Sequence, residues 1–333
     1  MTAFEHRQSA HCESGVMASL LTHAGLPMSE PMAFGLASGL AFAYLPIVKL
    51  GGMPLIAYRM PPRHLIKTLS KRLGVRLTSR TFANPEQGRM ALDAALDSGR
   101  LAGLQSSVFW LPYFPPEMRF HFNAHNLLAY GREGDEYLLS DPVFEEPVRC
   151  ASADLQKARF AKGALAAKGL MYYLDDVSPE QDWERLIRQS VLSTSRILDG
   201  MPLPWIGIRG IQHLAKCVEA LDPAQAKYNR LYLTHIVRMQ EEIGTGGAGF
   251  RFMYASFLQE AGEKIGDASL QEASSRLTAV GDDWRQFASA CVRASRSKGE
   301  APEFRPIADM LRGIAGQERV LMKELGAWAK RKG

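Results

Sequence analysis

The spacing of apolar residues changes near residue 178, and no other feature of the sequence constrains the fold more strongly. From residue 180 onward, apolar residues recur at intervals of three and four, the period of helices that bury one face. Before residue 178, helical segments alternate with short aliphatic and aromatic runs bounded by Pro, Gly and Asp, as strands are. The pattern predicts an α+β protein with a mixed N-terminal domain over residues 1–177 and an all-α helical domain over residues 178–333.

The two halves predict different sets of elements, and a length of 333 residues suits two domains. In the N-terminal half we expect helices at residues 13–23, 64–73 and 85–98, and strands at residues 104–110, 124–130 and 136–140. In the C-terminal half we expect helices at residues 183–198, 208–221, 228–243, 250–261, 270–292 and 307–328. We expect the helical domain to serve as a lid or to bind the substrate or a partner.

Composition excludes several classes of protein. The chain is 46% hydrophobic and 23% charged, and no apolar run approaches the ~20 residues of a membrane span. The first ten residues include Glu5, His6 and Arg7 and have no apolar core, so we expect no secretory signal and a cytoplasmic protein. The net charge of +5 favours acidic partners, but basic and acidic residues are interleaved, which argues against nucleic-acid binding.

One of the four cysteines lies in a context that favours chemistry. The cysteines are widely scattered and show no spacing that would bind zinc, so no metal is predicted. Cys12 falls in the first turn of the first predicted helix, where backbone N–H groups and the helix dipole lower a thiol pKa and can bind an oxyanion. Gln8 is a candidate side-chain donor to the same oxyanion, and the alternative for Gln8 is a solvated terminal side chain.

A predicted hairpin supplies a base and its partner. The runs at residues 125–130 and 136–141 flank a loop centred near Glu133, so positions 125 and 141 are equally distant from the turn and should face each other. A His and an Asp on facing strands form the base and the orienting carboxylate of a catalytic triad. We therefore predict Cys12 as nucleophile, His125 as base and Asp141 as its partner, with His121 as the second candidate for the base.

The helical half contains one glycine-rich interruption, GTGGAG at residues 244–249, followed closely by Arg251. Such a turn has free N–H groups, and with an arginine it can bind an anionic group such as the phosphate of phosphopantetheine. Gly246, Gly247 and Arg251 are therefore candidate anion-binding residues. The alternative is a plain connection between two helices.

The order of a Cys at a helix start, a His, and an Asp after the next strand resembles that of papain-like peptidases that process bacteriocin leaders. The whole chain resembles more closely the butirosin biosynthesis protein H family. The matching segments are HCES at residues 11–14, GLASGLAFAY at 35–44, WLPY at 110–113, the stretch from His125 to Pro142, GTGGAGFR at 244–251 and FLQE at 257–260. The resemblance implies a papain-like Cys-His-Asp acyltransferase domain, followed by the helical domain of unknown function of that family.

The resemblance also implies a reaction. The enzyme would transfer an acyl group from an acyl carrier protein, through an acyl-enzyme on Cys12, to an amine of a small-molecule acceptor in natural-product biosynthesis, with no cofactor besides the phosphopantetheine of the donor. The alternative is a cysteine peptidase or amidase that uses the same triad, and a further alternative is a binding module in which the cysteine only packs. The sequence leaves the acyl group, the acceptor, the pathway and the existence of a homo-oligomer open.

Overall fold

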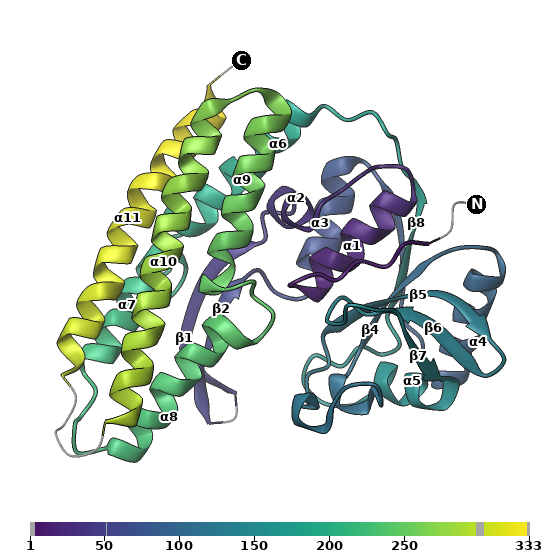
Figure 1. Cartoon of the computed structure of the whole chain (residues 1–333), viewed down its shortest axis with the longest axis horizontal. Helices are drawn as coiled ribbons and strands as arrows, with labels where there is room; N and C mark the ends of the chain where they lie inside the picture. Colours follow the sequence, from purple (N-terminus) through teal and green to yellow (C-terminus); the bar gives the residue numbers. More distant parts are fainter. Residues whose placement is uncertain (1–3, 51, 298–302, 332–333) are drawn as a thin grey trace. The chain divides into compact units, whose positions relative to one another are not determined.

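The computed structural model describes residues 4–50, 52–297 and 303–331 (Figure 1). The chain divides into two compact units. The first unit comprises residues 1–33 and 62–181, and the second comprises residues 34–61 and 182–333. The second unit thus includes residues 34–61, a segment that the sequence-based division at residue 177 assigns to the N-terminal domain.

The first unit is built on a six-stranded antiparallel sheet with strand order β3-β8-β4-β5-β6-β7. Its strands are β3 (Arg76–Arg80), β4 (Ala102–Ser106), β5 (His125–Glu133), β6 (Glu136–Ser140), β7 (Val148–Ala151) and β8 (Met171–Asp176). The strands predicted near residues 124–130 and 136–140 are β5 and β6. Residues 108–110, predicted as the end of a strand, form a 3-10 turn instead.

Helices cover both faces of this sheet. Strand residues Leu104, Leu127 and Ala129 form one core with Leu92 of α4 (Pro85–Asp97) and Leu155 of α5 (Ser152–Arg159). Successive strand residues point to opposite faces. The other face therefore receives α1 (Cys12–His23), which packs against β4, β5 and β8 and beside α3 (His64–Leu73), as Figure 1 shows. The sequence predicted α1, α3 and α4 to within one residue at each end.

Helix α1 is buried along most of its length. Every residue from Glu13 to Leu21 is buried, so this helix lacks the polar face of a surface helix. It ends at His23 with Ala24 as its C-cap, and Gly25 follows at φ +91°, a left-handed conformation that glycine adopts without strain. Glu13 accepts hydrogen bonds from the N–H groups of Leu65 and Ile66 at 3.1 and 3.3 Å, and it thereby caps the start of α3.

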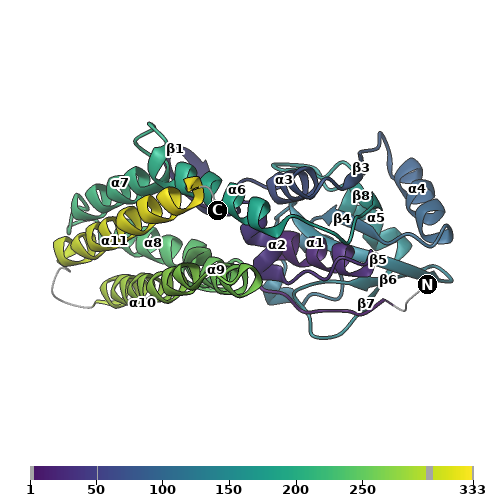
Figure 2. The same ribbon diagram turned by 90° about the horizontal axis from the view of Figure 1, so that it is seen from above.

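The second unit combines a β-hairpin with helices. The hairpin is β1 (Leu40–Leu50) with β2 (Met53–Arg59), and the helices are α6 (Trp183–Ser195), α7 (Gly207–Glu219), α8 (Ala226–Val237), α9 (Arg251–Ile265), α10 (Ala268–Arg296) and α11 (Phe304–Lys330). All six lie where the sequence predicted helices, and the long helices α10 and α11 run side by side (Figure 2). Among the described helices, none has an apolar stretch long enough to cross a membrane.

The hairpin belongs to the helical unit because its aromatic side chains complete that unit's core. Phe42 of β1 and Tyr58 of β2 pack edge to face, with ring centroids 5.2 Å apart, and both rings contact Trp284 of α10. Beside them, Arg251 and Glu318 form a fully buried ion pair, with Nε–Oε1 and Nη2–Oε2 distances of 2.8 and 3.1 Å. The indole N–H of Trp284 donates to the same Glu318 carboxylate at 2.8 Å.

We expect Glu318→Gln to destabilise the helical unit by about 3–5 kcal/mol, because it leaves the Arg251 guanidinium buried without a counter-charge. For a unit of this size, that loss lowers the midpoint of thermal unfolding by roughly 6–20 °C. Glu219→Gln is the matched control, since Glu219 pairs with Arg312 on the surface and its loss should cost at most about 1 kcal/mol. Equal midpoints for the two variants would contradict the prediction.

Candidate active site

Cys12 is the first residue of α1. The N-cap is His11, whose Nδ1 accepts a hydrogen bond from the backbone N–H of Ser14 at 3.4 Å. The thiol is half-buried, at the helix end where unpaired N–H groups and the dipole favour a negative charge. By contrast, burial raises the pKa of the Cys150 thiol to about 12 and raises the pKa of Cys291 as well. Cys150 and Cys291 are therefore poor nucleophiles.

The side chains of His125 and Asp141 are buried and in contact with each other. His125 begins β5, Asp141 follows the end of β6, and the distance from His125 Nε2 to Asp141 Oδ2 is 2.7 Å. The Tyr113 hydroxyl donates to the same Oδ2 at 2.9 Å, and the Val143 N–H donates to Oδ1 at 3.1 Å. Both oxygens of this fully buried carboxylate therefore have hydrogen-bond donors, as a buried charge requires.

His125 also interacts with Cys12, whose charge and hydrogen bonding raise the pKa of the imidazole. Because a carboxylate only accepts, the Nε2 that contacts Asp141 carries a proton, and Nδ1 is the ring atom left for the thiol. Burial lowers the pKa of His125, but the charge and hydrogen bonds of Asp141 and Cys12 more than offset burial and raise that pKa to about 10. A protonated imidazole is thus favoured beside the sulfur, as an imidazolium–thiolate pair requires.

The predicted register of the hairpin is wrong, although the two side chains do meet. Leu128 pairs with Ser140, and continuing that register would place residue 141 opposite residue 127 rather than opposite His125. A register shift between Ala129 and Gly131 and a two-residue turn at 134–135 account for the difference. Residues 125 and 127 share one face of the strand, so Asp141 reaches His125 along the diagonal.

Two other predicted residues lie apart from this contact. His121 precedes β5 and is exposed, and its ring stacks on Phe109 with centroids 4.0 Å apart. His121 therefore lies outside the strand that carries His125, and its role as the second candidate for the base stays a prediction. The Gln8 amide donates to the carbonyl of Val143 at 3.2 Å, and its role as an oxyanion donor stays a prediction.

Glu30, which the sequence analysis did not single out, holds the segment that leads into Cys12. Its carboxylate accepts from the N–H groups of Ala10 and His11 at 2.9 and 2.7 Å and from the Ser14 hydroxyl at 3.1 Å. Burial raises the pKa of Glu30, and these hydrogen bonds act in the opposite direction. Glu30 begins α2 (Glu30–Leu36), and a single acidic residue at a helix start gives no sequence signal of such a role.

Asn126 is a second residue that sequence reasoning missed. Its side-chain Nδ2 lies 4.0 Å from Cys12 Sγ, and its Oδ1 accepts a hydrogen bond from the Tyr172 hydroxyl at 3.1 Å. The amide is buried on the sheet face that α1 covers. Its position next to His125 was the only signal in the sequence.

The glycine-rich segment of the helical unit does not leave Arg251 available to a ligand. The guanidinium is fully buried, paired with Glu318, and donates through Nη1 to the carbonyl of Gly249 at 2.9 Å. In this geometry Arg251 joins α9 to α11 and stabilises the packing of the unit.

The turn itself is occupied by groups of the same chain. Gly246 and Gly247 adopt left-handed conformations at φ +68° and +88°, which glycine adopts without strain. The Gly247 N–H donates to the Thr245 hydroxyl at 3.1 Å, and the Ala248 N–H donates to both carboxylate oxygens of Glu241 at 3.2 Å. The turn therefore binds an anion, but that anion is the Glu241 side chain.

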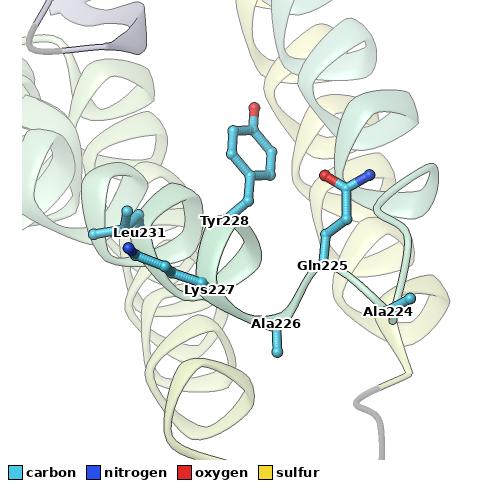
Figure 3. Close-up of a pocket in the computed structure, with 6 residues that line it drawn as sticks. All are labelled: Ala224, Gln225, Ala226, Lys227, Tyr228 and Leu231. Carbon is cyan, nitrogen blue, oxygen red and sulfur yellow. The ribbon is translucent and has the colours of Figure 1, made fainter.

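A shallow depression lies at the start of α8 (Figure 3). It is lined by Ala224, Gln225, Ala226, Lys227, Tyr228 and Leu231. None of these residues belongs to the predicted sites, and Tyr228 and Leu231 give the depression an apolar lining.

Comparisons with known proteins agree with the order of the two halves. The family model described as butirosin biosynthesis protein H, N-terminal, matches residues 11–142, and the model described as domain of unknown function DUF4872 matches residues 153–325. A solved structure from Bacillus anthracis, described as a C39-like peptidase, is 13% identical with a TM-score of 0.37, over 54% of this chain and 98% of that chain. No curated protein sequence matches this chain.

The pH dependence of Cys12 alkylation by iodoacetamide tests the His125 contact. Because the pKa of His125 is raised from 6.5 to about 10, the imidazolium stays charged at neutral pH and loses its proton only as the pH rises through about 10. Wild-type Cys12 should therefore react fast at pH 6–7, where an ordinary thiol is largely protonated. His125→Ala should reduce the rate at pH 7 about tenfold or more, as measured by intact-protein mass spectrometry.

Two further variants complete this test. His121→Ala should leave the alkylation profile unchanged, because His121 contacts Phe109. Asp141→Asn should be intermediate, since the imidazole remains but loses its counter-charge. Equal losses in the His121 and His125 variants would show that His125 is not the group that activates the thiol.

Proposed function

Because this chain belongs to the DUF4872 family and carries the N-terminal domain of butirosin biosynthesis protein H, we propose that it is an acyltransferase. The proposed donor is an acyl group held as a thioester on an acyl carrier protein, and the proposed acceptor is a small-molecule amine. The nucleophile is Cys12, the base is His125, and Asp141 orients the base. The observation that carries this proposal is that His125 contacts both Asp141 and Cys12, and that Cys12 is the first residue of a buried helix.

The geometry supports a reaction in two steps. In the first, the Cys12 thiolate attacks the thioester carbonyl, the carbon–sulfur bond of the donor breaks, and the His125 imidazolium protonates the departing thiolate of the pantetheine arm. In the second, the acceptor amine attacks the acyl-enzyme, His125 takes a proton from the amine, and the Cys12 thiolate leaves. The amide product and the starting enzyme result, so no oxidant, reductant or further co-reactant is required.

The hydrolytic alternatives use the same triad but resolve the acyl-enzyme with water. Water attacking the same intermediate would make the enzyme a thioesterase, and an amide in place of the thioester donor would make it a peptidase or amidase. Asp141, Tyr113 and His125 would have the same roles in each case. Product analysis with and without an amine acceptor therefore separates transfer from hydrolysis.

We expect the full-length protein, mixed with carrier proteins loaded with a series of short acyl groups, to gain the mass of one acyl group on Cys12. Added primary amines should then release that group as an amide faster than water releases it as an acid. Cys12→Ala should abolish both the mass gain and the amide. Mass spectrometry of the protein and of the products measures all three.

The remaining cysteines are the controls for that assay. Cys150→Ala and Cys291→Ala each remove a buried thiol and should leave the acylation site unchanged, as should Cys217→Ala. Amide formation by Cys12→Ala would exclude the covalent mechanism. Release only as the free acid, at every amine concentration, would identify a hydrolase.

A basic surface on α3 supports a carrier protein as the donor. Lys67, Lys71 and Arg76 are exposed on and just after α3, together with the half-buried Arg72. Arg76 forms an exposed ion pair with Asp176 at 3.6 Å. The side chains of Lys67 and Lys71 are exposed as well, so their positive charges face solvent. Helix α3 packs beside α1, and Glu13, the neighbour of Cys12, caps its first turn. Acyl carrier proteins are acidic, so their surface complements this one.

Salt should weaken the use of a carrier-bound donor but not of a small one. Between low ionic strength and 0.1 M, where the Debye length is ~10 Å, we expect kcat/KM for an acyl carrier protein to fall, while kcat/KM for an N-acetylcysteamine thioester stays constant. Lys71→Glu should reduce kcat/KM for the carrier donor and flatten its salt dependence.

Lys157→Glu makes the same change of charge on α5, which packs against the other face of the sheet, and should have little effect. Parallel salt profiles for the two donors would mean that the α3 surface has no part in donor binding.

A further inference from the structure

The side-chain amide of Asn126 points its N–H groups at the nucleophile. Nδ2 carries two hydrogens. One is donated to the carbonyl of Ala124 at 3.1 Å, and the other is directed to Cys12 Sγ, 4.0 Å away. The side chain is 2% exposed, so it lies within protein on every side. An amide N–H held beside the reacting sulfur is a group that can stabilise negative charge during the reaction.

Neighbouring groups determine which end of the amide faces the sulfur. The Ala124 carbonyl can only accept, so it selects Nδ2, and the Tyr172 hydroxyl donates to Oδ1 at 3.1 Å. Burial raises the pKa of Tyr172 well above its ordinary value, so this hydroxyl keeps its proton. A flipped amide would put Oδ1 against the Ala124 carbonyl and repel it. The N–H is therefore directed before any substrate binds.

The sheet makes room for the Tyr172 ring that orients Asn126. Tyr172 on β8 pairs with Gly103 on β4, and Gly103 pairs with Leu128 on β5. A Cβ atom at position 103 would lie 2.3 Å from the Tyr172 ring, a distance that no side chain tolerates. With glycine there, the ring crosses β4 and its hydroxyl reaches the Asn126 side chain on the next strand. Tyr172, Gly103 and Asn126 thus lie on three adjacent strands, and the Tyr172 hydroxyl reaches Asn126 along a diagonal.

We propose that Asn126 is the side-chain oxyanion donor of this active site, and that Tyr172 and Gly103 position it. This inference rests on the proposed acyl transfer through Cys12. When the thiolate attacks a thioester carbonyl, the carbonyl oxygen becomes negative while its carbon is bonded to Sγ. An N–H directed at Sγ in the free enzyme then lies beside that oxygen, and the backbone N–H groups at the start of α1 supply the other donors.

Gln8 is the competing candidate, and its surroundings differ from those of Asn126. Its side chain is exposed, and its amide donates to the Val143 carbonyl at 3.2 Å. An exposed amide must be ordered when substrate binds, whereas the buried amide of Asn126 is already fixed by two hydrogen bonds. Catalysis by charge stabilisation depends on donors that need no reorganisation, which favours Asn126.

The test compares two reactions of Cys12 in the full-length protein. Acylation by an N-acetylcysteamine thioester passes through an oxyanion, whereas alkylation by iodoacetamide displaces iodide and forms none. Asn126→Leu, which has nearly the same shape, should reduce the acylation rate about 100-fold and the alkylation rate much less. Tyr172→Phe should reduce acylation about tenfold, because the amide loses the partner of its Oδ1. Both rates are measured by intact-protein mass spectrometry of samples quenched at successive times.

Tyr173→Phe is the matched control, because Tyr173 is the next residue of β8 and its ring packs with the core on the opposite face. Acylation should be unchanged in this variant. The proposal is overturned if Asn126→Leu acylates within threefold of wild type, or if Asn126→Leu loses alkylation as severely as acylation. If Asn126→Leu does not fold, equal acylation rates for Tyr172→Phe and Tyr173→Phe overturn it in the same way.

A third comparison separates this inference from the proposed function. A 100-fold loss in Gln8→Ala without a loss in Asn126→Leu would assign the oxyanion donor to Gln8 and leave acyl transfer standing. A wild-type enzyme that is neither alkylated selectively at Cys12 nor acylated by any thioester would remove the proposed function, and the role of Asn126 with it.

Discussion

The buried hydrogen bond between His125 and Asp141 is the interaction on which the rest of the active site depends. A carboxylate that is fully removed from water needs donors for both oxygens, and Asp141 finds them in His125, in the Tyr113 hydroxyl and in the Val143 N–H. These donors come from the start of β5, from the loop before it and from the segment after β6. The hydrogen-bonding needs of one side chain thus bring three segments together. The positive charge that they stabilise on His125 is the charge that a Cys12 thiolate requires.

The same physical rule recurs through the molecule. Glu13 accepts the first N–H groups of α3, Glu30 accepts those of residues 10 and 11, and Glu241 accepts that of Ala248 in the glycine-rich turn. In the helical unit, Glu318 receives the Arg251 guanidinium and the Trp284 indole. In each place a carboxylate accepts hydrogen bonds from donors that belong to other parts of the chain, and in the helical unit those donors are fully buried. Two of these four carboxylates fix the chain on either side of Cys12: Glu30 binds the backbone of residues 10 and 11, and Glu13 binds the backbone of residues 65 and 66.

Local pattern alone was sufficient for most of the elements. The period of apolar residues and the capping signals placed α1, α3 and α4 to within one residue and located all six helices from α6 to α11. It did not reveal the β1–β2 hairpin, because an apolar run of that length is consistent with a buried helix as well as with a strand. Nor did it show that the hairpin joins the helical unit, which follows from the packing of Phe42 and Tyr58 on Trp284, more than 200 residues away in the sequence.

The sequence by itself determined the types of residue that could perform the chemistry and the local structures that carry them: a cysteine at a helix start, and a histidine and an aspartate at the open end of one hairpin. Those features depend on short-range geometry, which residue spacing encodes. Only the tertiary structure decided which groups meet. The register shift in β5 set the diagonal contact of His125 with Asp141, the pairing with Glu318 withdrew Arg251 from solvent, and the packing of α1 on β5 brought Asn126 to Cys12 across 114 residues of sequence. Contacts over such separations follow from how whole elements pack. Such packing produces no repeating pattern in the sequence from which the contacts could be predicted.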